Sequence, residues 1–297
     1  MGVSMGDIKR MRFWGTSAGE GSPSPFCRCR VCEYARKNGG KDIRTRTAFR
    51  IDEDVMIDVG ADYLTQSIKY NEDLFDVKHV LYSHTHNDHF NNTILRMRYV
   101  ALDRKPEGKI NLYFSPEGVD GAKSFYTGNE AFLTDDFVEF HKLDFYKTYT
   151  VGKYKVTPLK GHHHTDFEEN AANYIIEFPS GKIMYYALDS GEYFEETFEY
   201  LKNVKIDLLI GECTFPIEDN SCKVHMNLVD EEVCLNRLFE QGSINKDTVI
   251  YLTHICPMEK THKEIEKYWN ELDTPYKVNI AYDGLSIDAQ TDMFTDK

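Results

Sequence analysis

The 297-residue sequence has no apolar run long enough to form a membrane-spanning helix. Its first residues, MGVSMGDIKRMRFW, lack the apolar core of a secretory signal, and Gly6 occupies the position where a myristoylation site needs Ser or Thr. We find neither an internal repeat nor a low-complexity linker. These absences predict a soluble, cytoplasmic protein that has no membrane partner.

Basic residues are fewer than acidic ones. The sequence has 35 Lys and Arg and 49 Asp and Glu, which gives a formal net charge of −14. Proteins bind nucleic acids largely through Lys and Arg contacts with phosphates, so a long nucleic acid is a poor partner for this chain. One local basic cluster is expected to form a solvated face around a loop. It comprises Arg28, Arg30, Arg36, Lys37, Lys41, Arg44 and Arg46.

The seven cysteines are odd in number, and a chain without an export signal favours reduced thiols or metal ligands over a disulfide framework. Cys27, Cys29 and Cys32 lie within the short stretch FCRCRVC. Thiolates this close repel one another unless a cation lies among them, and Zn²⁺ prefers such soft donors in a closed tetrahedron. The stretch therefore predicts a structural zinc site, with reduced or redox-active thiols as the alternative.

Apolar runs of strand length, rich in β-branched and aromatic residues, recur along the chain. They are RMRFWGT, DVMIDVG, KHVLYSH, KINLYFS, KYKVTPL, ANYIIEF, KIMYYAL, DLLIGEC, TVIYLTH and KVNIAYD. TYTVGKYKV is typical of a hairpin that turns at Gly152 and Lys153. Asn227 can cap a helix whose apolar face begins at Leu228 and which stops at Gly242. This pattern predicts an α/β fold in which sheets pack together and helices lie outside.

The stretch SHTHNDHF holds three imidazoles and a carboxylate close together. A core cannot satisfy so many buried polar groups, whereas a bound cation can. His84 and His86 are two residues apart in an extended segment and therefore point the same way. We expect Asn87 to cap a following helix, which would place Asp88 and His89 in its first turn. One extended pair and one helical pair fit two neighbouring metal sites better than a single site.

Other apolar runs carry candidate ligands at their C-terminal ends, where functional groups gather in sheet-based folds. KVTPLKGHHHT ends in His162, His163 and His164, KIMYYALDSG in Asp189, and TVIYLTHIC in His254. Each has an ordinary explanation when taken alone, because an Asp after a strand usually serves a turn and a lone His is usually a hydrogen-bonded or surface residue. Together with HTHNDH, they favour a dinuclear metal centre.

HTHNDH resembles the HxHxDH signature of the metallo-β-lactamase superfamily. The resemblance covers nearly the whole chain, from Asp58 in MIDVG through His163 and Asp189 to His254. It implies a single domain, residues 1–297, with the four-layered αββα sandwich of that superfamily.

The same resemblance implies ligands for two divalent ions, zinc or manganese. The first site would hold His84, His86 and His163, the second would hold Asp88, His89 and His254, and Asp189 would bridge the ions. Asp58 would orient ligands from behind. His163 is chosen within its triplet because related hydrolases place this ligand four residues beyond the Leu of VTPL.

The CxCxxC stretch is similar to a structural zinc knuckle in close relatives, which include phosphodiesterases of bacterial phosphonate use. These relatives take the fourth ligand from a His at the position of Pro257, so Cys256 or His262 must replace it here. Cys256 is preferred because it stays beside the same strand end. His225 in KVHMNL matches a His that contacts phosphate in the relatives and can protonate the leaving oxygen, with a surface His at a helix end as the alternative.

These features predict a binuclear metal-dependent phosphodiesterase that hydrolyses a small phosphodiester, cyclic ones included, with a metal-bound hydroxide. Asp88 and His225 are the residues expected to act in catalysis. The alternatives are a lactone or thioester hydrolase on the same two metals and a metal-occupied binding module without catalysis. The aromatic-rich segment 125–154 is expected to face the core, and a substrate wall or a homodimer contact are its other options.

Overall fold

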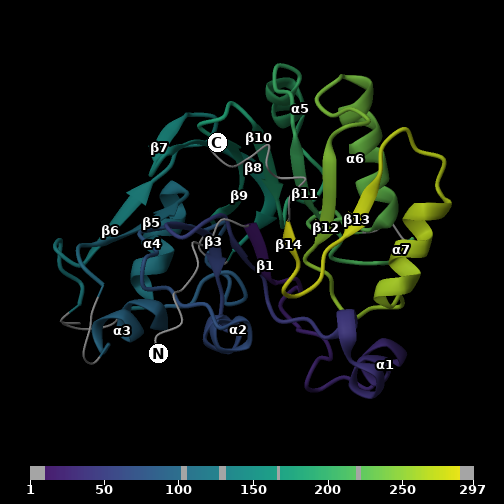
Figure 1. Cartoon of the computed structure of the whole chain (residues 1–297). Helices are drawn as coiled ribbons and strands as arrows, with labels where there is room; N and C mark the ends of the chain where they lie inside the picture. The colour runs from purple at the N-terminus through teal and green to yellow at the C-terminus, as the bar shows by residue number, and fades with distance from the viewer. Residues whose placement is uncertain (1–10, 102–105, 127–131, 166–167, 219–221, 288–297) are drawn as a thin grey trace.

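Two mixed β-sheets of seven strands each form the centre of the protein (Figure 1). The computed structural model describes residues 11–101, 106–126, 132–165, 168–218 and 222–287. In spatial order, the first sheet contains β14 (Ser286–Ile287), β1 (Met11–Gly15), β2 (Ala48–Arg50), β3 (Val55–Val59), β4 (His79–Leu81), β5 (Ile110–Phe114) and β6 (Val138–Lys142). The second contains β13 (Val278–Ile280), β12 (Val249–Thr253), β11 (Leu208–Glu212), β10 (Ile183–Ala187), β9 (Asn170–Glu177), β8 (Tyr154–His164) and β7 (Tyr149–Val151).

Each sheet joins an antiparallel half to a parallel half. In the first sheet, β14, β1, β2 and β3 are antiparallel neighbours, and β3 to β6 are parallel. In the second sheet, β7 to β10 are antiparallel neighbours and β10 to β13 are parallel. The hairpin predicted at Gly152 is confirmed, because β7 and β8 pair across this residue, whose φ of 56° suits glycine.

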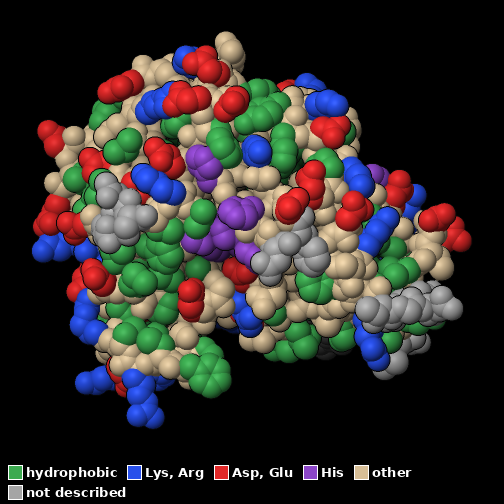
Figure 2. Space-filling view, turned by 180° about the vertical axis from the view of Figure 1, so that it is seen from behind, with side chains coloured by type: hydrophobic (Ala, Val, Ile, Leu, Met, Phe, Trp, Pro, Cys, Tyr) green, Lys and Arg blue, Asp and Glu red, His purple; other side chains and the backbone are tan. Residues whose placement is uncertain are grey.

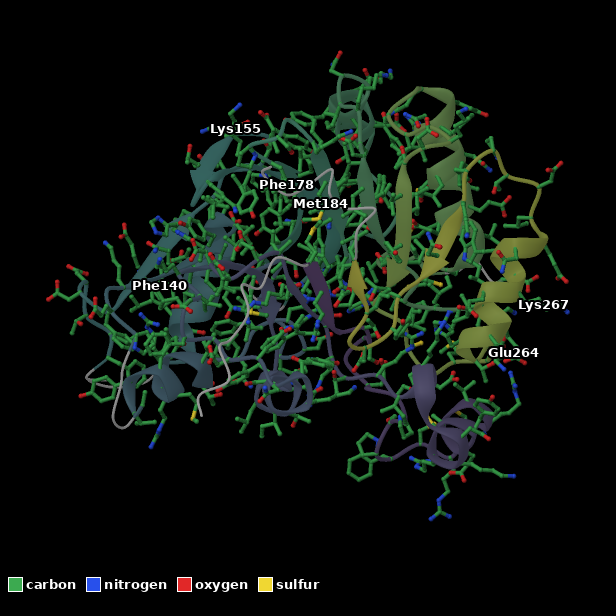
Figure 3. All side chains as sticks on the ribbon, viewed as in Figure 1. Phe140, Lys155, Phe178, Met184, Glu264 and Lys267 are labelled. Carbon is green, nitrogen blue, oxygen red and sulfur yellow. The ribbon has the colours of Figure 1, made fainter. Side chains whose placement is uncertain are left out.

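The two sheets bury an apolar layer between them. Phe49 of the first sheet lies against Tyr186 of the second, with ring centroids 5.8 Å apart. Phe178 and Met184 belong to the same buried cluster, and Figure 3 shows both inside the molecule with Lys155 at its edge. Alternate residues of each strand thus face the opposite sheet, which leaves the remaining apolar residues to face helices.

Helices cover the outer face of each sheet. The helices of the described residues are α1 (Arg30–Asn38), η1 (Gly40–Asp42, a 3-10 helix), α2 (Tyr63–Tyr70), α3 (Thr93–Tyr99), α4 (Pro116–Ser124), α5 (Glu195–Leu201), α6 (Leu228–Glu240) and α7 (His262–Glu271). Helices α2, α3 and α4 share a buried cluster with the first sheet, and α5, α6 and α7 share one with the second. The four-layered αββα sandwich is therefore confirmed. Within the described residues, none of these helices is both long and apolar enough to span a bilayer.

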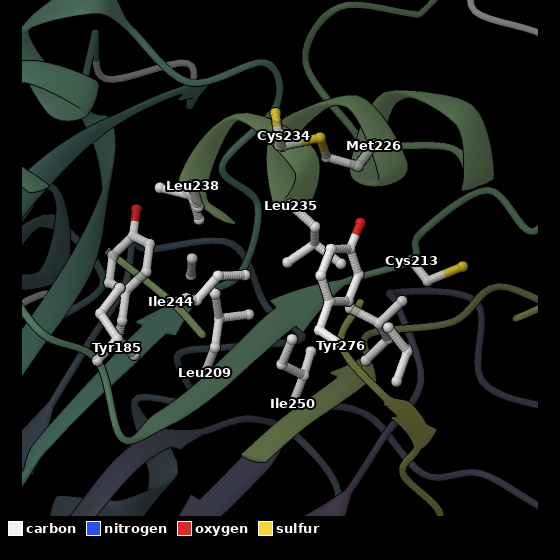
Figure 4. Packing of buried hydrophobic residues seen from close by; sticks show 14 of the residues in the cluster. Tyr185, Leu209, Cys213, Met226, Cys234, Leu235, Leu238, Ile244, Ile250 and Tyr276 are labelled. Atoms are coloured by element: carbon white, nitrogen blue, oxygen red, sulfur yellow. The ribbon is translucent and has the colours of Figure 1, made fainter. Parts of the chain in front are cut away.

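Helix α6 shows how local sequence determines these layers. Asn227 caps it, because its side-chain oxygen accepts hydrogen bonds from the backbone N–H groups of Val229 and Asp230, both at 2.9 Å. Leu235 belongs to the buried cluster of the second sheet together with Leu209 of β11, and Figure 4 shows both in this layer. The capped helix predicted after Asn227 is confirmed.

The helix predicted directly after Asn87 is wrong, because α3 begins only at Thr93. The backbone N–H of Val59 donates to the carbonyl of His89 (2.9 Å), and that of Ala61 donates to the carbonyl of Asn87 (3.3 Å). This segment is thus paired with the end of β3, and it forms turns instead of the first turn of a helix.

The aromatic-rich segment 125–154 mostly faces the core, as predicted. Phe132 is buried, and Phe140 packs against the cluster between the first sheet and its helices. Phe125 is 44% exposed and is the exception. Residues 127–131 lie outside the described residues.

The basic cluster is mostly the solvated face that was predicted, because five of its seven side chains are exposed, but Arg44 is buried. Its guanidinium donates to the hydroxyl of Thr16 (2.7 Å) and to the carbonyl of Ala281 (2.8 Å), and it lies 2.8 Å from Nδ1 of His262. Arg44 therefore joins the chain after β1 to α7 and to the segment after β13.

Candidate metal centre

The segments that carry the candidate ligands converge at one end of the sandwich. They follow β4, β10 and β12 or lie at the end of β8, so both sheets contribute. Figure 2 shows histidine side chains gathered in a hollow of one face, with hydrophobic side chains beside them. Residues far apart in the sequence meet here because parallel neighbouring strands end at the same edge of a sheet.

His84, His86 and His163 form the first group. Nε2 of His84 lies 2.9 Å from Nδ1 of His86, and Nε2 of His163 lies 3.0 Å from the same Nδ1 atom. Three ring nitrogens that face one another at this distance match the donor set of a divalent cation.

Asp88, His89 and His254 form the second group. The Nε2 atoms of His89 and His254 are 3.1 Å apart. The Oδ2 atom of Asp88 lies 3.3 Å from Nε2 of His89 and 3.6 Å from Nε2 of His254. The three donor atoms therefore surround a common point.

Asp189 contacts both groups. Its Oδ2 atom lies 2.7 Å from Nε2 of His89, 3.3 Å from Nε2 of His254 and 3.8 Å from Nε2 of His84. A carboxylate in this position can share its oxygens between two cations, which is the bridging place that the resemblance implied. Ligation by these seven residues stays a prediction.

The protonation states of the site suit cation binding. Burial holds the pKa of His84 well below its ordinary value and lowers the pKa of His163 to about 4, so both rings are neutral and offer lone pairs. Burial also opposes a charge on His89, but neighbouring carboxylates, Asp88 first among them, outweigh it and raise the pKa. Nδ1 of His163 is buried and lacks a hydrogen-bond partner among the described residues. The neutral imidazoles of His84 and His163 and the anionic carboxylates fit divalent cations.

Asp58 lies behind the second group and orients it. Its carboxylate accepts hydrogen bonds from the N–H (2.8 Å) and the hydroxyl (3.0 Å) of Ser83, and it lies 2.8 Å from Nδ1 of His89. A carboxylate on the far nitrogen of an imidazole sets the orientation of the ring. Asp58 thus lies where a residue that orients ligands from behind is needed.

Three residues of the site have a left-handed backbone, although none of them is glycine. The φ angle is 56° at Asp58, 48° at Asp189 and 58° at His254. Such conformations cost roughly 1–3 kcal/mol each and persist only where the surroundings impose them. Each stands at or just beyond the end of a strand, where the unusual turn directs its side chain toward the centre.

Sequence reasoning missed Glu212 and Thr214, which support the second group. The hydroxyl of Thr214 lies 2.9 Å from Nδ1 of His254 and donates to the carboxylate of Glu212. Glu212 is fully buried and accepts hydrogen bonds from the hydroxyl of Ser190 and the N–H of Gly191, both at 2.9 Å. Glu212 is the last residue of β11, within the run DLLIGEC, so the signal that identified the other candidates was present here too.

His225 lies at the border of the first group. Its Nδ1 atom is 2.9 Å from Oδ1 of Asp189 and 3.6 Å from Oε2 of Glu212, and its ring centroid is 4.5 Å from that of His163. Burial lowers its pKa, but Asp189 and Glu212 outweigh burial and raise the pKa to about 11. His225 is therefore a charged acid beside the cluster, and not a surface residue at the end of a helix.

Of the histidine triplet, the structure brings only the middle residue into the cluster. His162 lies against Phe194, with ring centroids 3.6 Å apart, and its Nδ1 atom contacts the carbonyl of Glu192. His164 is exposed. The alternation of side chains along β8 thus separates both neighbours from His163.

The three clustered cysteines lie together at the start of α1. Their sulfur atoms are within 4.8 Å of one another. The backbone N–H of Cys32 donates to Sγ of Cys29, and that of Cys29 donates to Sγ of Cys27, both at 3.4 Å. Sγ of Cys29 also contacts the carbonyl of Pro257 (3.3 Å), so the cluster meets the segment directly after β12.

Of the two candidates for the fourth ligand, His262 is the less available. Burial raises the pKa of the Cys256 thiol, and the charge of nearby Cys29 adds to the effect. Both ring nitrogens of His262 are already engaged, Nδ1 with Arg44 (2.8 Å) and Nε2 with Glu266 (2.9 Å). Zinc binding by the four thiols stays a prediction.

Comparisons with known proteins agree with this fold. Residues 53–255 match the family described as a beta-lactamase superfamily domain. A diphosphatase from the PhnP family has a similar structure, with a TM-score of 0.69 and 18% identity over 94% of this chain and 97% of that one. No curated protein matches the sequence.

Two other solved structures are also similar. Zinc-bound PqqB from Methylobacterium extorquens has a TM-score of 0.65 and 16% identity over 94% of this chain and 100% of that one. The short form of human tRNase Z has a TM-score of 0.60 and 16% identity over 94% and 98%. At such identities the likeness shows the fold alone.

Proposed function

The chain belongs to the metallo-β-lactamase superfamily, and from this premise we propose that it is a binuclear metal-dependent phosphodiesterase acting on a small phosphodiester, cyclic ones included. Family membership supports a metal-dependent hydrolase, and the phosphodiester is the added proposal. The observation that carries it is the pair of ligand groups joined by Asp189. The names diphosphatase and tRNase among the similar structures also support phosphate chemistry.

Each of the two ligand groups would bind one metal ion. His84, His86 and His163 would hold one ion, Asp88, His89 and His254 the other, and Asp189 both. Two divalent cations, zinc or manganese, would lower the pKa of a shared water toward about 7 and polarise the oxygens of the phosphodiester.

Asp88 supplies a charged carboxylate at the centre. Burial opposes its ionisation, but His89 and His254 outweigh burial and hold its pKa well below the ordinary value. The side chain keeps 12% of its surface exposed, so it can reach a water molecule in the hollow. We assign to Asp88 the orientation of the attacking water through a hydrogen bond that the carboxylate accepts.

His225 supplies the proton for the leaving group. Asp189 and Glu212 face its Nδ1 atom, which leaves Nε2 to donate a proton to the departing alkoxide oxygen. A positioned general acid of this kind contributes roughly 10²–10⁴-fold to the rate.

The basic side chains beside the site support a substrate with a single negative charge. Arg46 donates two hydrogen bonds to the carboxylate of Asp62, at 2.9 and 2.8 Å. Lys223, close to His225, pairs with Glu192 at 3.3 Å. Because Arg46 and Lys223 already pair with carboxylates, these two side chains offer little surplus positive charge to a polyanion. This favours a small phosphodiester over a long nucleic acid.

A substrate panel tests the proposal. With Mn²⁺ or Zn²⁺ present, we expect turnover of bis-p-nitrophenyl phosphate and of a ribose cyclic phosphate, and little turnover of lactones and thioesters. Failure to hydrolyse any phosphodiester while metal is bound would overturn the proposal. Turnover of a lactone or thioester alone would identify the other hydrolase, and tight ligand binding without turnover would identify a binding module.

A further inference from the structure

Glu169 is a buried carboxylate outside both ligand groups. Its Oε2 atom accepts hydrogen bonds from the N–H (2.9 Å) and the hydroxyl (2.5 Å) of Thr85 and a longer one from the hydroxyl of Thr165 (3.4 Å). Its Oε1 atom lies 3.4 Å from the hydroxyl of Ser115. Among the described residues, no Lys or Arg pairs with it, so hydrogen-bond donors alone stabilise the carboxylate.

The partners of Glu169 adjoin every member of the first ligand group. Thr85 stands between His84 and His86, and Thr165 follows His163 by two residues. The backbone N–H of Thr165 also donates to the carbonyl of Glu169 (2.9 Å). One side chain therefore fixes two segments that are far apart in the sequence and that together bring the three imidazoles face to face.

The other side of Glu169 meets the N-terminus of α4. Ser115 caps this helix, and a Cβ atom added at Gly118 would lie 2.1 Å from Oε1 of Glu169. Only glycine allows the helix to approach this closely, and the N-terminal end of a helix favours a negative charge. Helix α4 is thereby anchored against the loop that carries His84 and His86.

We infer that Glu169 is a positioning residue, whose carboxylate holds the Thr85 loop and the end of β8 in the arrangement that creates the first metal site. Glu169 touches no candidate ligand and acts only through Thr85 and Thr165. The role of Glu169 is measured by metal binding. The inference therefore rests on the proposed function only because the same metal ions would serve catalysis.

The test compares Glu169→Ala with Glu169→Gln. An amide can still accept from Thr85 through its oxygen and donate to Ser115 through its nitrogen, so the Gln variant keeps the connection that Ala removes. Mn²⁺ is the probe, because the thiolate cluster prefers softer ions and stays silent. Free Mn²⁺ is followed by its EPR signal during titration of each folded protein.

We expect Glu169→Ala to weaken binding of one Mn²⁺ by roughly 10–100-fold and to leave the second ion unaffected. We expect Glu169→Gln to bind both ions within about threefold of the unaltered protein. Glu177→Ala is the matched control, because Glu177 ends β9, which begins directly after Glu169, and it lies in a surface ion pair with Lys155 (2.7 Å). Thr85→Val, which removes one hydrogen bond, should give an intermediate loss and serves if Glu169→Ala does not fold.

Unchanged Mn²⁺ affinity in Glu169→Ala, or equal weakening of both ions, would overturn the inference. A loss in Glu169→Gln as large as that in Glu169→Ala would overturn it as well. Normal Mn²⁺ binding without phosphodiester turnover would instead contradict the proposed function and leave the role of Glu169 intact.

Discussion

At the centre of the site, Asp58, Asp189 and His254 hold backbone conformations that residues with a Cβ atom rarely adopt. These conformations direct the side chains toward the centre, which the backbone of an ordinary strand end would not do. The same region buries His84, Glu169 and Glu212, none of which adds apolar contact. The strained backbone and the buried polar groups of these residues lower the stability of the protein, but they place the ligand atoms, as is common at functional sites.

His225→Ala tests the proton donor. We expect kcat for a phosphodiester with an alkoxide leaving group to fall by roughly 10²–10⁴-fold, because the departing oxygen loses its acid. The loss should be much smaller for bis-p-nitrophenyl phosphate, whose leaving group needs no proton. His162→Ala is the control, since His162 lies against Phe194 away from the cluster. Equal losses for both substrates would argue against the assignment.

Glu169 also makes stability depend on pH. Burial outweighs its hydrogen bonds and raises the pKa from 4.5 to about 7, which corresponds to about 3 kcal/mol. The folded protein thus holds the proton more tightly than the unfolded chain, and the contribution present below pH 4.5 is lost as the pH rises through 7. The titratable groups on the elements packed against Glu169 are Glu117 and Asp120 on the exposed side of α4, Tyr174 of β9, and the histidines of the ligand loop and of β8.

Glu169→Gln removes this titration. Its free energy of unfolding in urea, relative to the unaltered metal-free protein, should therefore rise between pH 4.5 and 8 by up to about 3 kcal/mol. A difference that stays constant over this range would show that Glu169 does not titrate there.

Among the elements, strand ends and the loops after them build the centre. Residues 87–89 run against the end of β3 and use its backbone groups for their own hydrogen bonds. This contact leaves no room for a side chain at Gly60, where an added Cβ atom would lie 1.9 Å from the carbonyl oxygen of Asp88. The distance between β3 and the ligand loop is therefore set by a residue that binds nothing.

Gly60→Ala should push the ligand loop away from β3. We expect the free energy of unfolding to fall by about 1–3 kcal/mol, as for other overpacked sites, and the affinity for Mn²⁺ to fall with it. Gly19→Ala is a control for the free energy of unfolding alone, because the nearest neighbour of its Cβ atom would be the carboxylate of Asp88 at 3.4 Å. Urea denaturation and Mn²⁺ titration measure the two effects, and an unchanged Gly60→Ala protein would contradict this account.

For the whole molecule, the beginning and the end of the chain are joined at several points. Strand β1 pairs with β14, and Arg44 contacts His262 at the start of α7. Arg30 of α1 pairs with Glu264 of α7 at 3.0 Å, and the cysteine cluster touches Pro257. A zinc ion among the thiols would add a strong link to these contacts and would tie the first loop to the strand that carries His254.

Elemental analysis should therefore find three metal ions per chain, with zinc in the cysteine cluster. Cys29→Ser should lower the zinc content by one ion per chain and lower Tm by roughly 2–4 °C for each kcal/mol lost. Its Mn²⁺-dependent phosphodiesterase activity should largely persist, because the ligand groups are untouched. Cys222→Ser, which alters a thiol outside the cluster, is the control, and an unchanged zinc content in Cys29→Ser would refute a zinc ion bound by Cys29.

Local patterns in the chain were enough to locate most of the strands and the imidazoles and carboxylates of the centre. Apolar runs such as KIMYYAL and TVIYLTH are strands because their β-branched and aromatic side chains suit a sheet buried on both faces. Strands β2, β6 and β14 escaped notice because they are short or charged and form only beside existing neighbours. The capped helix after Asn227 was visible for the same local reason.

Contacts between distant segments settled the rest. Which histidine of the triplet faces the centre, the turns after Asn87, and the burial of Arg44 and Glu169 all depend on which segment lies alongside. No periodicity along the chain records such neighbours, because hydrogen bonding and desolvation act between residues that only folding brings together. The sequence therefore predicted which side chains could bind metal, whereas the packing of the two sheets determined their orientation and burial.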